Sequence, residues 1–382
     1  MTGKIVTSVL SWLILFLGFL GLFFFGNSSI SFACMLVWLL LPVVSFFMNL
    51  RARRNISVSI QVLPGTSKNS TVQGILNIKN RGIIPVSCVF CRVQVINQLT
   101  REKNEILLSL KAVSKGNVQK EFQIASEHCG YLYVSAEKIY LMDWMGFLPV
   151  PCPAKALGKV SVLPDTFSPN LYLSMSMARR EDAAFWSQEQ KGTDYTEVFS
   201  LRDYADGDSL KQNHWKLSSK RQQLIVKEPS LPIEKSQLIF WDKNAAAASP
   251  GEMDAMAECV ASISQTILEQ GTSFALGWTE GKNKVFEEID AEEQLIQAIP
   301  RMLKWGPDTS AGSGAFLYAQ AGLGNTYAKT IYVAKTYPED FEPLSDGDMT
   351  LVLCDRTIDR AAWPLVTFDA ATYLTDLETI EL

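Results

Sequence analysis

Four side chains that could transfer protons lie close together in the middle of this 382-residue chain. They are Glu197, Asp203, Asp208 and His214. Carboxylates and an imidazole at such short spacing could supply a general acid, a general base or the group that activates a nucleophile. The sequence therefore offers one catalytic hypothesis, a membrane-tethered hydrolase that uses the region of Asp208 and His214.

The rest of the chain contains no known catalytic motif that would support this hypothesis. The sequence has two histidines, and it lacks a Gly-x-Ser-x-Gly turn, a phosphate loop ending in Lys-Ser or Lys-Thr, and a His-Glu-x-x-His pair. The glycine pairs at 312–314 and 322–324 have no lysine after them and predict ordinary loops. We therefore expect a protein that is not an enzyme and needs no cofactor, with the hydrolase as the alternative.

The same region carries a longer motif. It runs as a glycine, a glutamate, then Leu-Arg-x-Tyr-x-x-Gly-Asp, and finally a basic residue before His-Trp-Lys-x-Ser. The matching positions are Gly192, Glu197, Leu201, Arg202, Tyr204, Gly207, Asp208, Lys211, His214, Trp215, Lys216, Ser218, Ser219 and Lys220. Two lysines, at 211 and 220, replace the usual arginines, and Ser219 replaces the usual alanine. Residues 192–228 therefore resemble the signature block of the bacterial domain of unknown function 58 family.

A second segment carries the same resemblance. Asp143 and Gly146 match the Asp-x-x-Gly-Leu turn of the family, with Phe147 in place of the leucine. The resemblance covers about residues 125 to 280 and implies a von Willebrand factor A-like C-terminal part. Proteins of this family are commonly linked to MoxR-type AAA+ ATPases and to membrane-bound transglutaminase-like proteins. The resemblance thus implies a non-enzymatic adaptor that couples such an ATPase to a membrane or cell-envelope client.

Two interpretations of the signature block stay open. In the structural one, Arg202 forms a bidentate pair with Asp206 or Asp208 and so fixes the loop. Trp215 then anchors a short helix in a core. In the other, Arg202, His214, Trp215 and Lys216 dock a partner, because Trp and Arg dominate interface hot spots. The residues that we expect to carry one role or both are Glu197, Arg202, Tyr204, Gly207, Asp208, His214, Trp215 and Lys216.

Two apolar runs open the chain. Ile5–Phe25 and Ile30–Leu50 contain no charged residue, and each has the roughly 20 residues that a helix needs to cross a bilayer. Only four residues separate them, which predicts a tight helical hairpin. Lys4 precedes the first run and three arginines between 51 and 54 follow the second, and such residues stay on the cytoplasmic side. We expect two spans in the bacterial inner membrane, with the soluble part in the cytoplasm.

The stretch from Asn55 to about Asp165 alternates between apolar and polar residues in short runs, separated by turn formers such as Pro64-Gly65. The runs are Ile56–Val62, Val72–Ile78, Val86–Ile96, Glu105–Leu110, Val118–Ile124, Tyr131–Val134 and Val160–Val162. Several short strands at this spacing predict an all-β, immunoglobulin-like sandwich.

After Pro232 the order of predicted elements becomes β-α-β. Strands are expected at 237–241, 272–278, 330–334 and 350–354, and helices at 253–269 and 292–303. This alternation predicts a parallel, doubly wound sheet, which the family resemblance identifies as von Willebrand factor A-like. The expected domains are a hairpin at 1–54, the sandwich at 55–165, a polar linker with the signature block at 166–232, and the α/β domain at 233–382.

Asp242 ends the first strand of the α/β part and raises the question of a metal site. Integrin-type A domains bind Mg²⁺ through Asp-x-Ser-x-Ser, whose oxygens suit that ion. Here Asn244 offers a carbonyl oxygen, Ala246 offers no ligand, and Lys243 adds a positive charge. The sequence therefore predicts a degenerate site that binds no metal, which argues against a metal-dependent adhesion module.

Cysteines and charge exclude two further classes of function. Seven scattered cysteines suit reduced thiols in a cytoplasmic chain. Cys88 and Cys91 have the spacing of a zinc knuckle, but they lie in a predicted strand, where positions three apart point to opposite faces. We expect them to be structural. The net charge of −5 argues against nucleic-acid binding, and the basic run from Lys211 to Lys227 predicts a solvated face.

Overall fold

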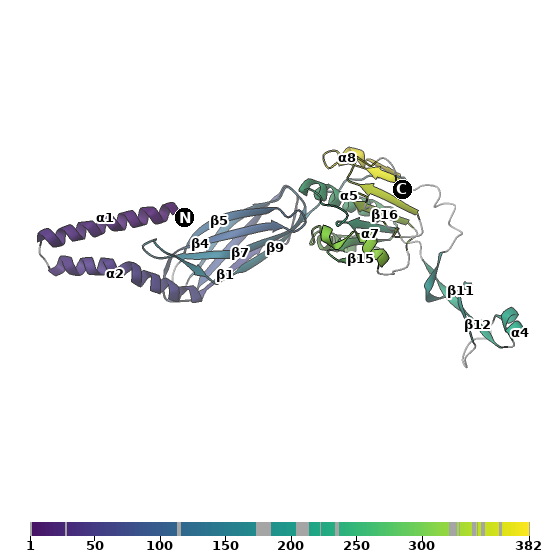
Figure 1. Cartoon of the computed structure of the whole chain (residues 1–382), viewed down its shortest axis with the longest axis horizontal. Helices are drawn as coiled ribbons and strands as arrows, with labels where there is room; N and C mark the ends of the chain where they lie inside the picture. The colour runs from purple at the N-terminus through teal and green to yellow at the C-terminus, as the bar shows by residue number, and fades with distance from the viewer. Residues whose placement is uncertain are drawn as a thin grey trace. The chain divides into compact units, whose positions relative to one another are not determined.

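The computed structural model divides the chain into two compact units, Met1–Leu163 and Pro164–Leu382 (Figure 1). It describes residues 2–26, 29–112, 116–172, 185–203, 214–221, 223–233, 237–320, 329–337, 348–358 and 361–381, together with residues 327, 341, 343 and 344.

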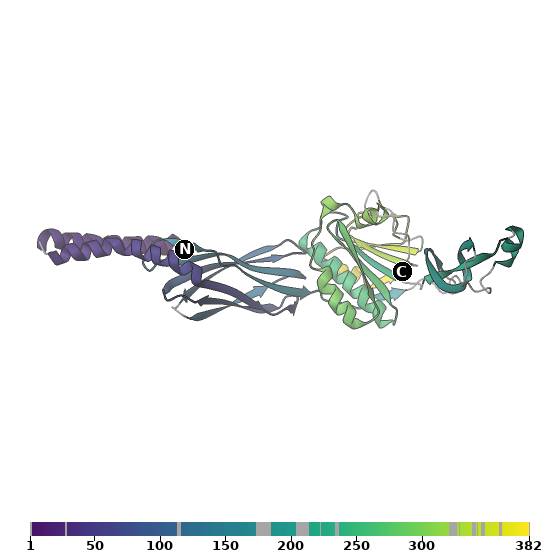
Figure 2. The ribbon, with the colours of Figure 1, turned by 90° about the horizontal axis from the view of Figure 1, so that it is seen from below.

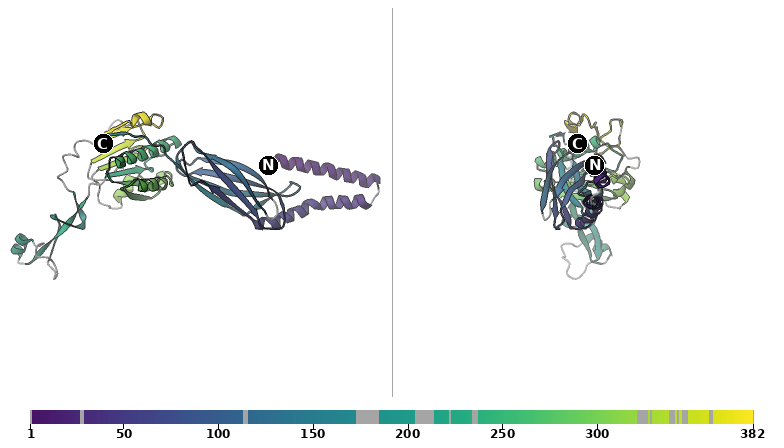
Figure 3. Two further views of the ribbon diagram at one scale, coloured as in Figure 1. Left: turned by 180° about the vertical axis from the view of Figure 1, so that it is seen from behind. Right: turned by 90° about the vertical axis from the view of Figure 1, so that its left-hand side faces the viewer.

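The first unit begins with two apolar helices, α1 (Thr2–Gly26) and α2 (Ser29–Ala52), followed by the 3₁₀ helix η1 (Arg53–Asn55). Both helices are long and apolar enough to cross a membrane, so the predicted helical hairpin is confirmed. Trp12 and Trp38 link them reciprocally, because each indole N–H donates to the backbone carbonyl of the other at 3.4 Å. The N-terminal end of α1 lies at the sandwich end of the hairpin (Figure 3).

Two sheets follow in the first unit and form the predicted β-sandwich. The strands are β1 (Ile56–Val62), β2 (Gly65–Ser67), β3 (Thr71–Asn80), β4 (Val86–Asn97), β5 (Lys103–Ala112), β6 (Asn117–Ala125), β7 (Gly130–Met142), β8 (Pro149–Cys152) and β9 (Ala156–Leu163). One sheet has the order β1-β3-β6, and the other has the order β2-β9-β7-β4-β5 with β8 beside β7. All of these pairs are antiparallel except β2 with β9.

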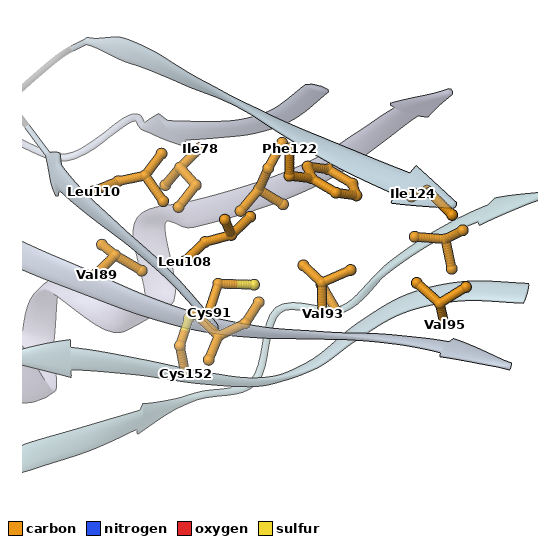
Figure 4. Close-up of a cluster of buried hydrophobic side chains, with 14 of the residues drawn as sticks. Ile78, Val89, Cys91, Val93, Val95, Leu108, Leu110, Phe122, Ile124 and Cys152 are labelled. Carbon is orange, nitrogen blue, oxygen red and sulfur yellow. The ribbon is translucent and has the colours of Figure 1, made fainter. Parts of the chain in front are cut away.

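The alternation seen in the sequence directs one face of each sheet into a shared core. Figure 4 shows Ile78 of β3 and Phe122 of β6 opposite Val93 of β4. Cys91 also lies in this core, whereas Cys88 is half-buried, so the two thiols do not share one environment. Burial raises the pKa of the Cys91 thiol to about 11, which keeps it protonated and fits the structural role that we expected.

The second unit contains a six-stranded sheet with the order β15-β14-β13-β16-β17-β18. Its strands are β13 (Gln237–Asp242), β14 (Phe274–Glu280), β15 (Asn283–Ile289), β16 (Lys329–Ala334), β17 (Asp348–Leu353) and β18 (Leu365–Thr367). Only the edge strand β15 is antiparallel to its neighbour among these pairs. The four strands expected here are present, while β15 and β18 are additional, because polar edge strands lack a clear apolar run.

Helices cover the two faces of this sheet. They are α5 (Pro250–Glu269), α6 (Glu292–Met302), α7 (Gly314–Gln320) and α8 (Tyr373–Asp376), with a 3₁₀ turn η3 (Thr309–Ala311) before α7. The apolar stripe expected on α5, with Met256, Val260 and Ile263, is fully buried. Through Ala315 and Tyr318, α7 packs on the face that carries Phe240.

The segment 166–232, expected to be a polar linker with the signature block, contains strands that the sequence did not predict. Within it, β10 (Asn170–Tyr172) pairs in parallel with β19 (Thr379–Glu381), at the other end of the unit in sequence. Further on, β11 (Phe185–Asp203) pairs antiparallel with β12 (Ile225–Ile233). A strand whose partner lies about 200 residues away leaves no local signal in the sequence.

Candidate functional site

Helix α4 (Trp215–Arg221) follows His214 and is held against the start of β12. The backbone N–H of His214 donates to the carbonyl of Ile225 at 2.7 Å, and the carbonyl of His214 accepts from Leu217 and Ser218 at 2.9 Å. On the other side, Ser218 Oγ accepts from the N–H of Ile225 at 2.9 Å. Bonds in both directions therefore tie this short helix to the strand.

The side chain of His214 also serves this local structure. Its Nδ1 accepts a hydrogen bond from the N–H of Leu217 at 3.3 Å, so the imidazole caps the helix. An Nδ1 that accepts from its own helix is not directed toward a substrate proton, as the nitrogen of a general base must be.

Trp215 lies on the outer face of α4 and is 60% exposed. The expectation that it anchors the helix in a core is wrong, because the buried contact of α4 runs through Ser218 to Ile225 and Val226. Lys216 beside it is also exposed. The helix thus presents an aromatic ring and an ammonium group to solvent on a backbone that is fixed in place.

The strand β11 brings other parts of the signature block to the same place (Figure 2). In the register of the two strands Arg202 lies opposite Val226, and Asp203 lies opposite Ile225. Glu197 lies on β11 as well, but the structure describes only the backbone of Glu197 and Arg202. The remaining block residues Tyr204, Gly207 and Asp208 lie outside the described residues.

The ladder between β11 and β12 is irregular along most of its length. Its register shifts four times between Trp186 and Ser200, so that 19 residues of β11 face nine of β12. Pro229 and Pro232 lie in β12, and a proline has no N–H to donate to a ladder. Regular pairing returns only from Ser200 to Asp203, next to α4, so the end that carries Trp215 is the well-paired one.

Asp242 lies at the carboxyl edge of the second sheet, and its buried carboxylate is fully engaged. One oxygen accepts from the N–H of Asn244 at 2.9 Å. The other accepts from the N–H of Gly314 at 2.5 Å and from the hydroxyl of Tyr332 at 2.6 Å. Burial raises the pKa of Asp242 above its usual value, although these hydrogen bonds oppose the shift. The carboxylate joins β13, β16 and the start of α7.

The side chains of the two residues after Asp242 also form hydrogen bonds within the protein. Lys243 is buried, and its Nζ donates to the carbonyls of Met302 at 2.6 Å and Trp305 at 2.9 Å, at the C-terminal end of α6. Burial lowers the pKa of Lys243 to about 7. Asn244 accepts from the N–H of Asp308 at 3.0 Å, so its carbonyl oxygen has a protein donor.

A second lysine stands at the end of the neighbouring strand. Lys335 follows β16 and pairs with Glu252, which also completes the capping box of α5 with Ser249. Ammonium groups and hydrogen-bonded oxygens thus occupy this edge of the sheet. Over the described part of the chain, no group of three or more His, Cys, Asp or Glu side chains could hold a metal ion.

The sequence did not reveal the roles of two residues, one that holds Asp242 in place and one that holds α4 in place. Tyr332 reaches Asp242 only because parallel pairing sets Ala334 opposite Asp242 and Tyr332 opposite Phe240. Ser218 belongs to the motif, yet nothing in the motif separates its anchoring role from the exposed position of Ser219. Both roles depend on long-range pairing.

Comparisons with known proteins give limited guidance. No family model matches the chain, and no curated protein matches it. Among solved structures it is similar to the CARDB domain of the PF1109 protein from Pyrococcus furiosus, with 18% identity, a TM-score of 0.23, and coverage of 28% of this chain and 91% of that one. It is also similar to a cohesin module of a family 33 glycoside hydrolase from Clostridium perfringens, with 11% identity, a TM-score of 0.22, and coverage of 28% and 96%. The two sheets and the core between them are what identify the sandwich.

Proposed function

We propose that this protein is a membrane-anchored, non-enzymatic adaptor that binds a partner through α4 and the adjoining end of β11 and β12. One observation carries the proposal: Trp215 is 60% exposed on a helix fixed by hydrogen bonds to β12. A tryptophan in water adds nothing to the stability of its own chain, whereas one buried by a partner typically contributes about 2 kcal/mol or more to binding. The fixed backbone lowers the entropy lost on docking.

The anchor in this proposal is the hairpin of α1 and α2. Almost none of the residues in the two candidate spans is fully buried within the described chain, and many large apolar side chains there are exposed. A hydrocarbon layer would cover it, and each helix satisfies its own backbone there. The arginines at 51, 53 and 54, directly after the second span, support a cytoplasmic soluble part on a bacterial inner membrane.

The sheet order of the second unit supports a von Willebrand factor A-like, doubly wound domain. From β13 the chain adds β14 and β15 on one side, and then β16, β17 and β18 on the other, so the strand order reverses between β13 and β16. Helix α5 connects β13 to β14, and α6 and α7 lie between β15 and β16. The signature-block resemblance to the domain of unknown function 58 family supports a MoxR-type AAA+ ATPase as the partner. The same resemblance supports a transglutaminase-like membrane protein or another cell-envelope client.

The hydrolase alternative finds no favourable contact in the described residues. The imidazole of His214 accepts from a backbone N–H and caps α4 instead of facing a nucleophile. Asp208, the other residue of that hypothesis, lies outside the described residues. ATP hydrolysis in the adaptor model is the work of the partner.

The proposal is tested by crosslinked pull-down from detergent-solubilised native membranes. The baits are the wild type, Trp215→Ala and Trp305→Ala, since Trp305 is a matched tryptophan with 48% exposure in the same unit. We expect an AAA+ ATPase with the wild type and with Trp305→Ala, and a loss on the order of tenfold with Trp215→Ala. Absence of the ATPase from every bait would overturn the adaptor role. Equal recovery with all three would keep the role and overturn the docking site.

A further inference from the structure

A rigid loop joins β7 to β8 at the hairpin end of the sandwich. In this loop, Asp143–Leu148, the buried carboxylate of Asp143 accepts from the N–H groups of Met145, Phe147 and Leu148 at 3.3, 2.6 and 2.9 Å. Gly146 has φ of +78° and donates to the carbonyl of Asp143 at 3.0 Å. Asp143 therefore satisfies four backbone N–H groups of its own loop, which lowers the cost of placing this segment in a water-poor environment.

This loop rests on both apolar helices. The N–H of Trp144 donates to Ser45 Oγ of α2 at 2.8 Å. A Cβ on Gly146 would lie 2.7 Å from Ser8 Oγ of α1, so the glycine permits this close approach. The ring of Phe147 meets the ring of Trp12 edge to face, with centroids 5.8 Å apart. The loop Asp143–Leu148 thus joins the sandwich to both helices of the hairpin.

The contacts fix the level of the loop along the helices. The candidate span of α1 begins at Ile5, so Ser8 and Trp12 lie roughly 5 and 10 Å inside its start at 1.5 Å per residue. On α2, Ser45 lies about 7 Å before the end of the charge-free run at Leu50. In a hydrocarbon core of about 30 Å, these depths lie in the outer part of the acyl-chain region, beneath the headgroups of one leaflet.

At that level the loop exposes apolar side chains. Trp144 is 46% exposed and Leu148 is 48% exposed. The indole N–H of Trp144 donates to the carbonyl of Pro85 at 3.1 Å, which brings in the neighbouring loop Arg81–Pro85 and its Ile83, 77% exposed. An amphipathic tryptophan flanked by aliphatic residues is the composition that proteins place at membrane interfaces.

Three exposed arginines lie near the end of the second charge-free run, on the headgroup side of Ser45. Arg51 and Arg54 are exposed at the end of α2 and in η1. Arg81 is exposed too, and its N–H donates to the carbonyl of Asn55 at 3.0 Å, which sets it next to Arg54. Guanidinium groups at this level suit the phosphates of anionic lipids, with each charge contributing about 1 kcal/mol near such a surface.

We infer that the loops Asp143–Leu148 and Arg81–Pro85 form a lipid-contacting surface at the hairpin end of the sandwich. Trp144, Leu148 and Ile83 enter the outer part of the acyl-chain region in the leaflet next to the sandwich, and the arginines bind anionic headgroups above them. The inference rests on the proposed membrane anchoring of α1 and α2. It adds that the sandwich is seated on the bilayer through its own loops, in addition to the two spans.

The test places a polarity-sensitive NBD fluorophore on the full chain in vesicles of phosphatidylcholine and phosphatidylglycerol. The background carries Cys34→Ala and Cys88→Ser, because the other five cysteines are buried. One variant carries Leu148→Cys. The control carries Leu63→Cys, a leucine with 60% exposure that follows the far end of β1, whose near end adjoins η1. We expect blue-shifted emission at position 148, quenching by doxyl-labelled lipid and loss of quenching by iodide. Position 63 should show the reverse.

Extraction with alkaline carbonate distinguishes a failure of the lipid-contacting surface from a failure of the proposed membrane anchoring. Iodide quenching at position 148 in protein that resists extraction would overturn the inference and leave the anchoring intact. Release of the protein by carbonate would overturn the anchoring, and with it the lipid-facing loops. Lipid quenching at both positions would also overturn the inference, because the sandwich would then lie along the bilayer instead of meeting it with these loops. Vesicles without phosphatidylglycerol should weaken the lipid quenching at position 148 if the arginines act as inferred.

Discussion

The N–H of Ile225 lies 2.9 Å from Ser218 Oγ, and this hydrogen bond joins α4 to the first residue of β12. Both residues are buried, although Trp215 on the same helix is largely in water. The small polar side chain therefore fixes the helix, and the large aromatic one remains available. This division of roles within seven residues is the structural basis of the proposed docking site.

Replacing Ser218 with alanine should loosen α4 without removing any side chain from the proposed docking surface. The N–H of Ile225 would lose its acceptor in a buried place, at a cost of about 1–3 kcal/mol. We expect faster hydrogen exchange at the Ile225 amide and weaker recovery of the partner, as with Trp215→Ala. The exposed neighbour Ser219→Ala is the control and should change neither. Unchanged exchange in Ser218→Ala would contradict the anchoring role.

Lys243 should make the stability of the protein depend on pH. Burial lowers its pKa in the folded chain to about 7, against the usual value of 10.5 for a lysine in water. Between these values the unfolded chain binds a proton that the folded chain has lost, so the free energy of unfolding rises with pH. Lys243→Met should abolish this rise, which amounts to on the order of 2 kcal/mol between pH 7 and pH 9.

The measurement for Lys243 is urea unfolding of the full chain in detergent at pH 7 and pH 9. Only the difference between wild type and variant is read, because other groups titrate in the same range. The exposed Lys282→Met is the control and should keep the pH profile of the wild type. A profile of Lys243→Met that matches the wild type would show that this lysine is not held in a low-pKa environment.

Asp242 should stabilise the sheet edge without a metal ion. In Asp242→Asn only one of the two positions keeps an oxygen, so either the N–H of Asn244 on one side or the N–H of Gly314 and the hydroxyl of Tyr332 on the other lose their acceptor. We expect the free energy of unfolding to fall by about 1–3 kcal/mol. Added Mg²⁺ should leave the thermal midpoint of wild type and variant unchanged. A Mg²⁺-dependent rise seen only in the wild type would show that Asp242 is a metal ligand.

Asn49 of α2 should be a weak point of the first unit. It is buried, and neither its amide nitrogen nor its oxygen has a hydrogen-bond partner among the described residues. Asn49→Leu, a residue of similar size, should raise the free energy of unfolding by about 1–3 kcal/mol. Ser45→Ala should act in the opposite direction, because it removes the acceptor of the Trp144 N–H. Thermal unfolding of the full chain in detergent compares the two, and destabilisation by Asn49→Leu would indicate an unseen polar partner.

Part of the candidate site follows from the motif alone. The motif located His214, Trp215 and Lys216, and the structure places them together at the start of α4. It did not show that Trp215 faces solvent, because the sequence pattern of a helix is the same whether its tryptophan packs in a core or is exposed to water. That outcome depends on β12, which meets the helix through Ser218 and leaves the tryptophan uncovered.

Local pattern determined the elements of this protein. The charge-free runs became α1 and α2, the alternation at 56–62 became β1, and the stripe from Met256 to Ile267 became the buried face of α5. Periodicity and hydrophobicity are properties of consecutive residues, so the sequence alone contains them. Only the tertiary structure decided that β10 pairs with β19, that Tyr332 closes on Asp242, and that Trp144 reaches Ser45. Each of these contacts joins residues at least 90 positions apart, and their geometry exists only after the sheets and helices have packed.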